Sequence, residues 1–188
     1  MFNDLSVLKK SGLCLLFALI TGVFAQITIP LPYIPITGQT LAVGLAAVIL
    51  GSKLGAATMV VYLLLGAVGL PVFSDLQSGV NVLVGPSGGY IFGFVLTAYV
   101  TGLILEKSSF TLGWATVANI VGMGITLAFG MIQLMIVLEL TFTAALQAGV
   151  IPFLITGVIK AFLASAGGVW VRRFLGHEPK EERLEKAS

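Results

Sequence analysis

The sequence predicts an all-α integral membrane protein of six transmembrane helices, with both termini cytoplasmic and a loop-covered pocket on the outer side. Three observations predict this class. Of the 188 residues, 57% are hydrophobic and 10% are charged, whereas a soluble globular domain carries about 25% charged residues. Apolar runs long enough to cross a bilayer recur along the chain. Lys and Arg occur at every other connection between these runs.

The apolar runs define the expected helices in order. Two shorter blocks, 38–51 and 54–70, are separated by Gly51-Ser52-Lys53. One long hairpin or two shorter helices would fit there, and the break favours two. The first long run begins after Lys9 and Lys10 and exceeds the apolar core of a signal peptide, so it is expected to stay as a helix. The four runs near full spanning length are 11–29, 88–106, 113–138 and 151–172.

The basic residues predict which connections face the cytoplasm, because cytoplasmic loops are enriched in Lys and Arg. The connections 30–38, 71–87 and 140–150 contain neither residue type. The other boundaries carry Lys9, Lys10, Lys53, Lys107, Arg172 and Arg173. We therefore expect a single multi-pass domain of the cytoplasmic membrane over 1–188, in contact with lipid. It would comprise a cytoplasmic N-terminus (1–10), a six-helix bundle (11–173) and a charged cytoplasmic tail (174–188).

The three connections without basic residues have unusual sequences. Pro30, Pro32 and Pro35 favour extended backbone in the first. The second, 71–87, is too long and too apolar for a hydrated loop. It is expected to be re-entrant or to form a lid, since irregular backbone at membrane depth is tolerated where it is buried or lines a cavity. The third leads to Pro152 at the start of a helix. A binding site that opens outward is therefore expected.

Lys160 is the basic residue that does not fit the alternation, because it lies about two turns into the last helix. A charge inside a spanning helix costs at least about 2.5–3.5 kcal/mol at the bilayer centre and marks a functional site by default. The alternative is snorkelling of the amine to the headgroups. An ammonium in this place is expected to pair with an anion, either a substrate carboxylate or Glu139.

Polar and glycine residues near the outer connections are further candidates for ligand binding. The segment GPSGGY places Gly88, Gly89 and Tyr90 at the start of a helix, where glycines allow close approach of a ligand and free N–H groups are available. A tight turn or a packing role is an equal alternative. Asn81 and Gln77 are candidates for hydrogen bonds to a ureido or amide group. A polar row opens the second helix, with helix capping as the alternative for its first member: Thr37, Gln39 and Thr40.

Small residues form a stripe on the first helix. Ala18 and Gly22 are four residues apart, with Ala25 close by. Such spacing lets membrane helices approach closely. Packing inside the chain and docking on a partner protein explain the stripe equally well.

Several function classes are excluded or disfavoured. The sequence has no His-Glu-x-x-His, no closely spaced carboxylate pair, no Ser-His-Asp set and no nucleotide-binding motif, so it is not expected to be an enzyme. The net charge of +2, with scattered basic residues, gives no indication of nucleic-acid binding. His177 lacks companions for a metal site, and no cofactor is expected. Cys14 is the single cysteine, and a packing role is expected for it.

Four segments together resemble the BioY family: PLPYIPITGQTLAV at 30–43, GLPVF at 69–73, GPSGGYIFGF at 85–94 and GVIPF…IK at 149–160. Proteins of this family are biotin-specific substrate-binding (S) components of energy-coupling factor transporters. The resemblance implies six helices, a loop-covered biotin pocket near the outer face, and coupling to a transmembrane subunit and two ATPases. It also implies that small residues of the first helix, here Ala18 and Gly22, dock on the transmembrane partner.

The resemblance has one departure beside Lys160. The family has an acidic residue three positions before this lysine, where this chain has Gly157. Residues at that spacing share a helix face. Lys160 therefore needs another acid or the ligand's own carboxylate to compensate its charge.

The sequence thus predicts high-affinity biotin binding and uptake across the cytoplasmic membrane as an S component. Lys160 is expected to hold the biotin carboxylate, Asn81 and the backbone near Gly88 and Gly89 to contact polar atoms, and Tyr90 to form a pocket wall. A carrier for another small carboxylated vitamin and a non-transporting membrane scaffold subunit are the alternatives.

Overall fold

Helices make up nearly all of the regular structure in the computed structural model, which describes residues 6–175. The predictions for the N-terminal residues 1–5 and for His177 and the charged tail beyond residue 175 lie outside this range. Six helices correspond to the six predicted runs: α1 Val7–Ala25, α2 Gln39–Leu50, α3 Ser52–Ala67, α5 Gly88–Lys107, α6 Leu112–Val137 and α8 Ile151–Phe174. The predicted helix boundaries differ from these by four residues at most.

Four of these helices, α1, α5, α6 and α8, are long and apolar enough to cross a membrane. The coarse prediction of an all-α, multi-pass membrane protein agrees with this arrangement. The helices α2 and α3 have 12 and 16 residues, so neither alone reaches the roughly 20 residues that a spanning helix needs. The predicted break between them is present, because Gly51 has φ 82° and separates the two helices. A residue with a side chain is rarely found in that conformation.

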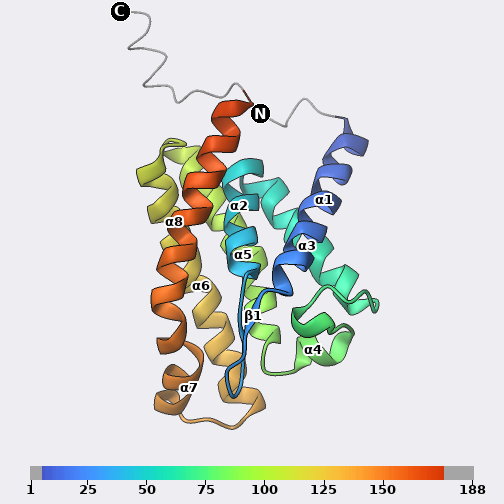
Figure 1. Cartoon of the computed structure of the whole chain (residues 1–188), viewed down its shortest axis with the longest axis vertical. Coiled ribbons are helices and arrows are strands. Elements are labelled where there is room, and N and C mark those ends of the chain that lie inside the picture. The colour runs from blue at the N-terminus through green and yellow to red at the C-terminus, as the bar shows by residue number, and fades with distance from the viewer. Residues whose placement is uncertain (1–5, 176–188) are drawn as a thin grey trace, which may run out of the picture.

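The connections gather at two ends of the helix bundle (Figure 1). The start of α1, the α2–α3 and α5–α6 connections and the end of α8 lie at one end, at the top of the view. These are the boundaries that carry the basic residues. The connections without basic residues lie at the opposite end, which we call the loop end: 30–35 in a hairpin, 68–87 and 138–141.

The loop end contains a β-hairpin, a 3₁₀ turn and two short helices. The proline-rich connection forms a two-stranded antiparallel hairpin, β1 Thr28–Ile29 and β2 Ile36–Thr37, in the register Thr28↔Thr37 and Ile29↔Ile36. The connection between α3 and α5 contains the 3₁₀ turn η1 Ser74–Leu76 and the short helix α4 Val80–Val84. The third connection contains α7 Phe142–Gly149, where the sequence predicts a connection without a helix. Thr141 begins α7 by accepting a hydrogen bond from Ala144 N.

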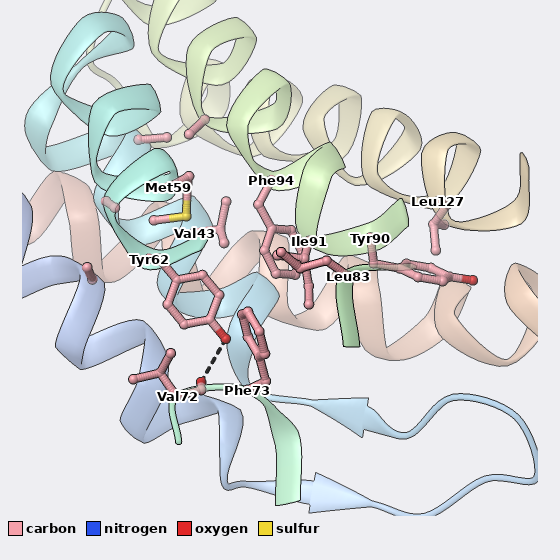
Figure 2. Packing of buried hydrophobic residues seen from close by; sticks show 14 of the residues in the cluster. Val43, Met59, Tyr62, Val72, Phe73, Leu83, Tyr90, Ile91, Phe94 and Leu127 are labelled. Carbon is pink, nitrogen blue, oxygen red and sulfur yellow. Dashed lines mark hydrogen bonds between the residues drawn. The ribbon is translucent and has the colours of Figure 1, made fainter. Parts of the chain in front are cut away.

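The core joins the helices to the segment 69–79, as Figure 2 shows. Tyr62 of α3 is fully buried, and its hydroxyl donates to Val72 O at 2.8 Å. Its ring meets that of Phe73 edge to face, with centroids 5.6 Å apart. Phe73 lies directly over Gly66, where a Cβ would overlap the ring. Gln26 at the end of α1 holds the same segment, since its side chain donates to Phe73 O and accepts from Leu76 N.

Candidate functional site

A cavity lies between α2, α5, α6 and α8 and is bounded by two of the loop-end segments. The hairpin contributes Ile34, Pro35 and Thr37, and the α3–α5 connection contributes Ser74 and Ser87. Most of the wall between the polar groups is apolar, formed by Val43, Ile91, Phe94, Met123, Leu127 and Phe153. Ligand sites are usually concave and apolar with a few placed polar groups, and this cavity has that character.

Five of the predicted ligand-binding residues line this one cavity: Gln39, Thr40, Tyr90, Gly157 and Lys160. They come from three helices that are far apart in the sequence. The remaining three lie elsewhere. Asn81 is exposed on α4, and Gly88 and Gly89 are buried in the packing at the start of α5.

Gly88 and Gly89 provide space for neighbouring backbone. A Cβ at Gly88 would overlap Leu83 O, and a Cβ at Gly89 would overlap Phe129 O. Gln133 of α6 seals the same corner by donating to Leu83 O at 2.8 Å and to Gly85 O at 2.6 Å. In this conformation the two glycines therefore have the packing role that the sequence left open as an alternative.

Lys160 of α8 extends its ammonium to the end of the hairpin. Nζ donates to Thr37 O at 2.8 Å, and no ion pair with Glu139 or another acid is found within residues 6–175. The side chain is half-buried and lines the cavity. An ammonium has three N–H donors, so donors remain for an anion that enters the cavity. Gly157 contributes no carboxylate and instead packs against the thioether of Met123.

Gln39 is fixed at the start of α2 by a chain of hydrogen bonds. Its Nε2 donates to Tyr62 Oη at 2.6 Å, and its Oε1 accepts from Thr37 Oγ1 at 2.7 Å. Because the Tyr62 hydroxyl donates to Val72 O, it must accept from Gln39. Thr37 also accepts from the backbone N–H of Gln39. This cavity wall is thus tied to both the hairpin and the segment 69–79.

Tyr90 forms the side of the cavity next to α7. Its hydroxyl donates to Gly149 O at 2.7 Å, and its ring lies over Gly130, where a Cβ would overlap it. The ring of Phe153 lies beside it with centroids 5.9 Å apart. Tyr90 therefore joins α5, α6, α7 and α8 at one point and has little freedom to move.

Sequence reasoning missed the polar residues deeper in the cavity. Asn119 lines the wall, and its Nδ2 donates to Ser165 Oγ at 2.9 Å. Thr97 and Thr126 also line it, with their hydroxyl oxygens 2.7 Å apart. A signal existed, because an amide side chain within a 26-residue apolar helix is expensive unless it has a partner or a function.

The two candidate partner-docking residues are covered by the chain itself. Ala18 is fully buried in α1, and Gly22 is also buried, with Val72 3.1 Å from the position of its missing Cβ. In this conformation Gly22 therefore serves a contact with the segment 69–79. The exposed face of α1 carries larger apolar residues: Leu15, Leu16, Leu19 and Val23.

Comparisons with known proteins agree with the fold. The chain is 40% identical over 158 residues to a biotin transporter BioY from Thermotoga maritima, which covers 84% of this chain and 90% of the relative. It is 35% identical over 163 residues to the biotin transporter BioY2 of Lactococcus lactis, covering 87% and 90%. These relatives are named as transporters.

A solved structure and a family model match most of the chain. The crystal structure of an S-component for biotin from an ECF-type ABC transporter superposes with a TM-score of 0.80, covers 88% of this chain and 92% of the other, and is 23% identical. At that identity the match establishes the fold alone. The model of the BioY family matches residues 2–177. This chain belongs to the BioY family.

Proposed function

We propose that this protein binds biotin in the cavity and carries it across the cytoplasmic membrane as the substrate-binding component of an energy-coupling factor transporter. The family and the named relatives support biotin as the ligand. The observation that carries the proposal is the ammonium of Lys160 at the wall of an apolar cavity, held by the carbonyl oxygen of Thr37. Biotin offers the matching chemistry, with a carboxylate, an apolar chain and a polar ring.

In this proposal Lys160 donates to the biotin carboxylate. The negative charge of the ligand then supplies the compensation that Gly157 does not provide. Phe94, Phe153 and Tyr90 pack against the apolar parts of the ligand. Asn81, Gly88 and Gly89 lie outside the cavity wall, so for them ligand contact requires a rearrangement of residues 79–89.

The membrane arrangement follows from the positions of the connections. We place the end that carries Lys53 and Lys107 in the cytoplasm, because cytoplasmic loops are enriched in basic residues. The loop end then faces outward, and the hairpin and the segment 69–79 form its cover. The six helices α1, α2, α3, α5, α6 and α8 would all lie in the membrane, with the short α2 extended by the hairpin.

The proposed partners are a transmembrane coupling subunit and ATPase subunits. The sequence has no nucleotide-binding motif, so the energy for uptake has to come from another chain if uptake is driven by ATP. Measuring uptake of labelled biotin in cells with and without coexpressed ATPase and coupling subunits tests this. Uptake that is unaffected by their presence would contradict a dependence on the module.

A competition experiment tests the ligand. Purified protein in detergent is equilibrated with labelled biotin and then with unlabelled biotin, lipoate or pantothenate. Displacement by biotin alone at equal concentration supports the proposal. Stronger displacement by lipoate or pantothenate would identify a carrier for another vitamin, and a membrane scaffold subunit would bind none of the three.

A further inference from the structure

Asn119 is the most deeply buried amide side chain of the cavity wall. Its exposed fraction is 6%, and it comes from α6, seven residues after that helix begins. Gly44 of α2 and Ala164 of α8 lie beside it, as the position of a Cβ at Gly44 shows. It thus belongs to the part of the cavity away from the loop end.

The orientation of the Asn119 amide is fixed by its neighbour Ser165. The hydroxyl of Ser165 donates to Ala161 O at 2.6 Å, so its single hydrogen is already used. Its oxygen can then only accept, and Asn119 has to present Nδ2 to it, at 2.9 Å. The amide oxygen Oδ1 therefore points away from Ser165.

Oδ1 of Asn119 has no hydrogen-bond donor within residues 6–175. Solvent can still reach this oxygen. Among residues 6–175, the one side-chain polar atom that is closed to solvent and also lacks a hydrogen-bond partner is Nε of Arg172. The missing side chain of Gly44 makes room for this oxygen, since a Cβ there would lie 2.5 Å from Oδ1. A buried acceptor without a donor is costly, so this oxygen is suited to a donor that enters the cavity.

The other amide of the wall has its oxygen occupied. Oε1 of Gln39 accepts from Thr37, while Nε2 donates to Tyr62. Thr97 and Thr126 bond each other, and Thr97 also contacts Gly122 O. Among the side chains described for this wall, Asn119 Oδ1 is the one acceptor-only oxygen that still lacks a donor.

Building on the proposed biotin binding, we propose that Asn119 Oδ1 accepts an N–H of the ureido ring and so makes the site specific for ligands with that donor. Lys160 and Ser165 are five residues apart on α8, a rise of about 7.5 Å. The ammonium, bonded to Thr37 of the hairpin, and the amide, bonded to Ser165, thus lie at different depths of a cavity with a largely apolar wall. The two polar ends of biotin are likewise separated by its apolar chain. A site built to bond an N–H rejects an analogue that lacks it, because its buried acceptor stays unpaired.

The test uses biotin analogues N-methylated at each ureido nitrogen in turn, with affinity measured by displacement of labelled biotin. For the wild-type protein, methylation at one nitrogen is expected to weaken binding about 10- to 100-fold, the range for an unpaired buried polar group. Asn119→Ala is expected to bind biotin more weakly and to bind the methylated and unmethylated ligands with similar affinity. Ser165→Ala, which frees the amide to rotate, is expected to reduce the discrimination in part.

The matched control is Thr101→Ala. Thr101 is fully buried, donates to Ala118 O on α6 and lies outside the cavity wall, so its removal should leave discrimination unchanged. Wild-type protein that binds biotin but tolerates methylation at both nitrogens would overturn the role of Asn119, as would full discrimination in both Asn119→Ala and Ser165→Ala. Wild-type protein that binds no biotin would instead overturn the proposed function.

Discussion

Lys160 is the residue on which the proposed carboxylate contact depends. Replacing it with alanine removes a charged hydrogen bond of about 1.5–3 kcal/mol, so the affinity for biotin should fall about 10- to 150-fold. The affinity for biotinamide, which carries no charge at that end, should fall only slightly. Comparing both ligands by equilibrium displacement checks this. An equal loss of affinity for both ligands would show that Lys160 acts by supporting Thr37. The control is Lys53→Ala, at an exposed position of the opposite end.

At the residue scale, the sequence predicted which residue types the site would contain better than it predicted which residues line the cavity. Lys160 was found because a charge in an apolar helix is exceptional. Gly88 and Gly89 were candidates for ligand contact because glycine permits close approach, but what approaches them is the chain's own Leu83 and Phe129 carbonyl oxygens. Sequence spacing cannot distinguish these cases, since both need a missing Cβ. Asn119 stands out in the sequence as an amide in an apolar helix, but its proposed contact depends on the orientation imposed by Ser165, which sequence spacing does not record.

Among the elements, the segment 69–79 is tied to α3 by Phe73, which lies over Gly66. Gly66→Ala places a methyl group where the ring lies, so the segment should detach from α3. We expect faster hydrogen exchange at residues 72–79 and weaker biotin binding, because Ser74 would leave the cavity wall. Hydrogen exchange followed by mass spectrometry measures the first effect.

The control for this change is Gly124→Ala. No atom lies within 4 Å of a Cβ at Gly124 in α6, and alanine is a better helix former than glycine by about 0.8–1.0 kcal/mol. Exchange of the segment 69–79 should be unchanged in that variant. Unchanged exchange in Gly66→Ala as well would show that Phe73 does not hold the segment.

Arg172 fastens the end of α8 to the end of α2. Its Nη1 donates to Val48 O at 3.1 Å and Ile49 O at 3.2 Å, and its guanidinium lies 3.5 Å from the ring centre of Phe110. Lysine keeps the charge but loses the planar stacking and the fixed donors. Arg172→Lys should therefore lower the thermal unfolding temperature in detergent, while Lys53→Arg should not. Equal unfolding temperatures would mean that these contacts contribute nothing to stability.

The long helices could be predicted because their apolar runs are unambiguous, whereas the small elements could not. Extended backbone was predicted for the connection 30–38, which contains the strand β2 and bends at 32–34. The pairing of β2 with β1 depends on contacts with Gly38 and α1 that no local pattern records. The helix α7 has eight residues, too few for periodicity to identify it with certainty. In the sequence, Arg172 indicates only which end of the helix faces the cytoplasm. Its contact with α2 could not be predicted, because it depends on where the α2 carbonyl oxygens lie in space.

For the whole molecule, the proposed orientation is open to cysteine labelling. In a Cys14→Ala background, Gln77→Cys places a thiol at the loop end and Ser108→Cys places one at the opposite end, both at exposed positions. A membrane-impermeant maleimide should label Gln77→Cys in intact cells and Ser108→Cys only after permeabilisation. The reverse pattern would invert the molecule and place the cavity opening in the cytoplasm.

Equilibrium binding of labelled biotin to the purified wild-type protein, without any partner subunit, tests the central claim most directly. Because residues from four helices and two connections of this chain line the cavity, we predict saturable binding of about one biotin per chain, as expected for a single pocket, with full displacement by unlabelled biotin. The absence of saturable binding by a folded, monodisperse preparation would contradict the assignment of this cavity as a biotin site.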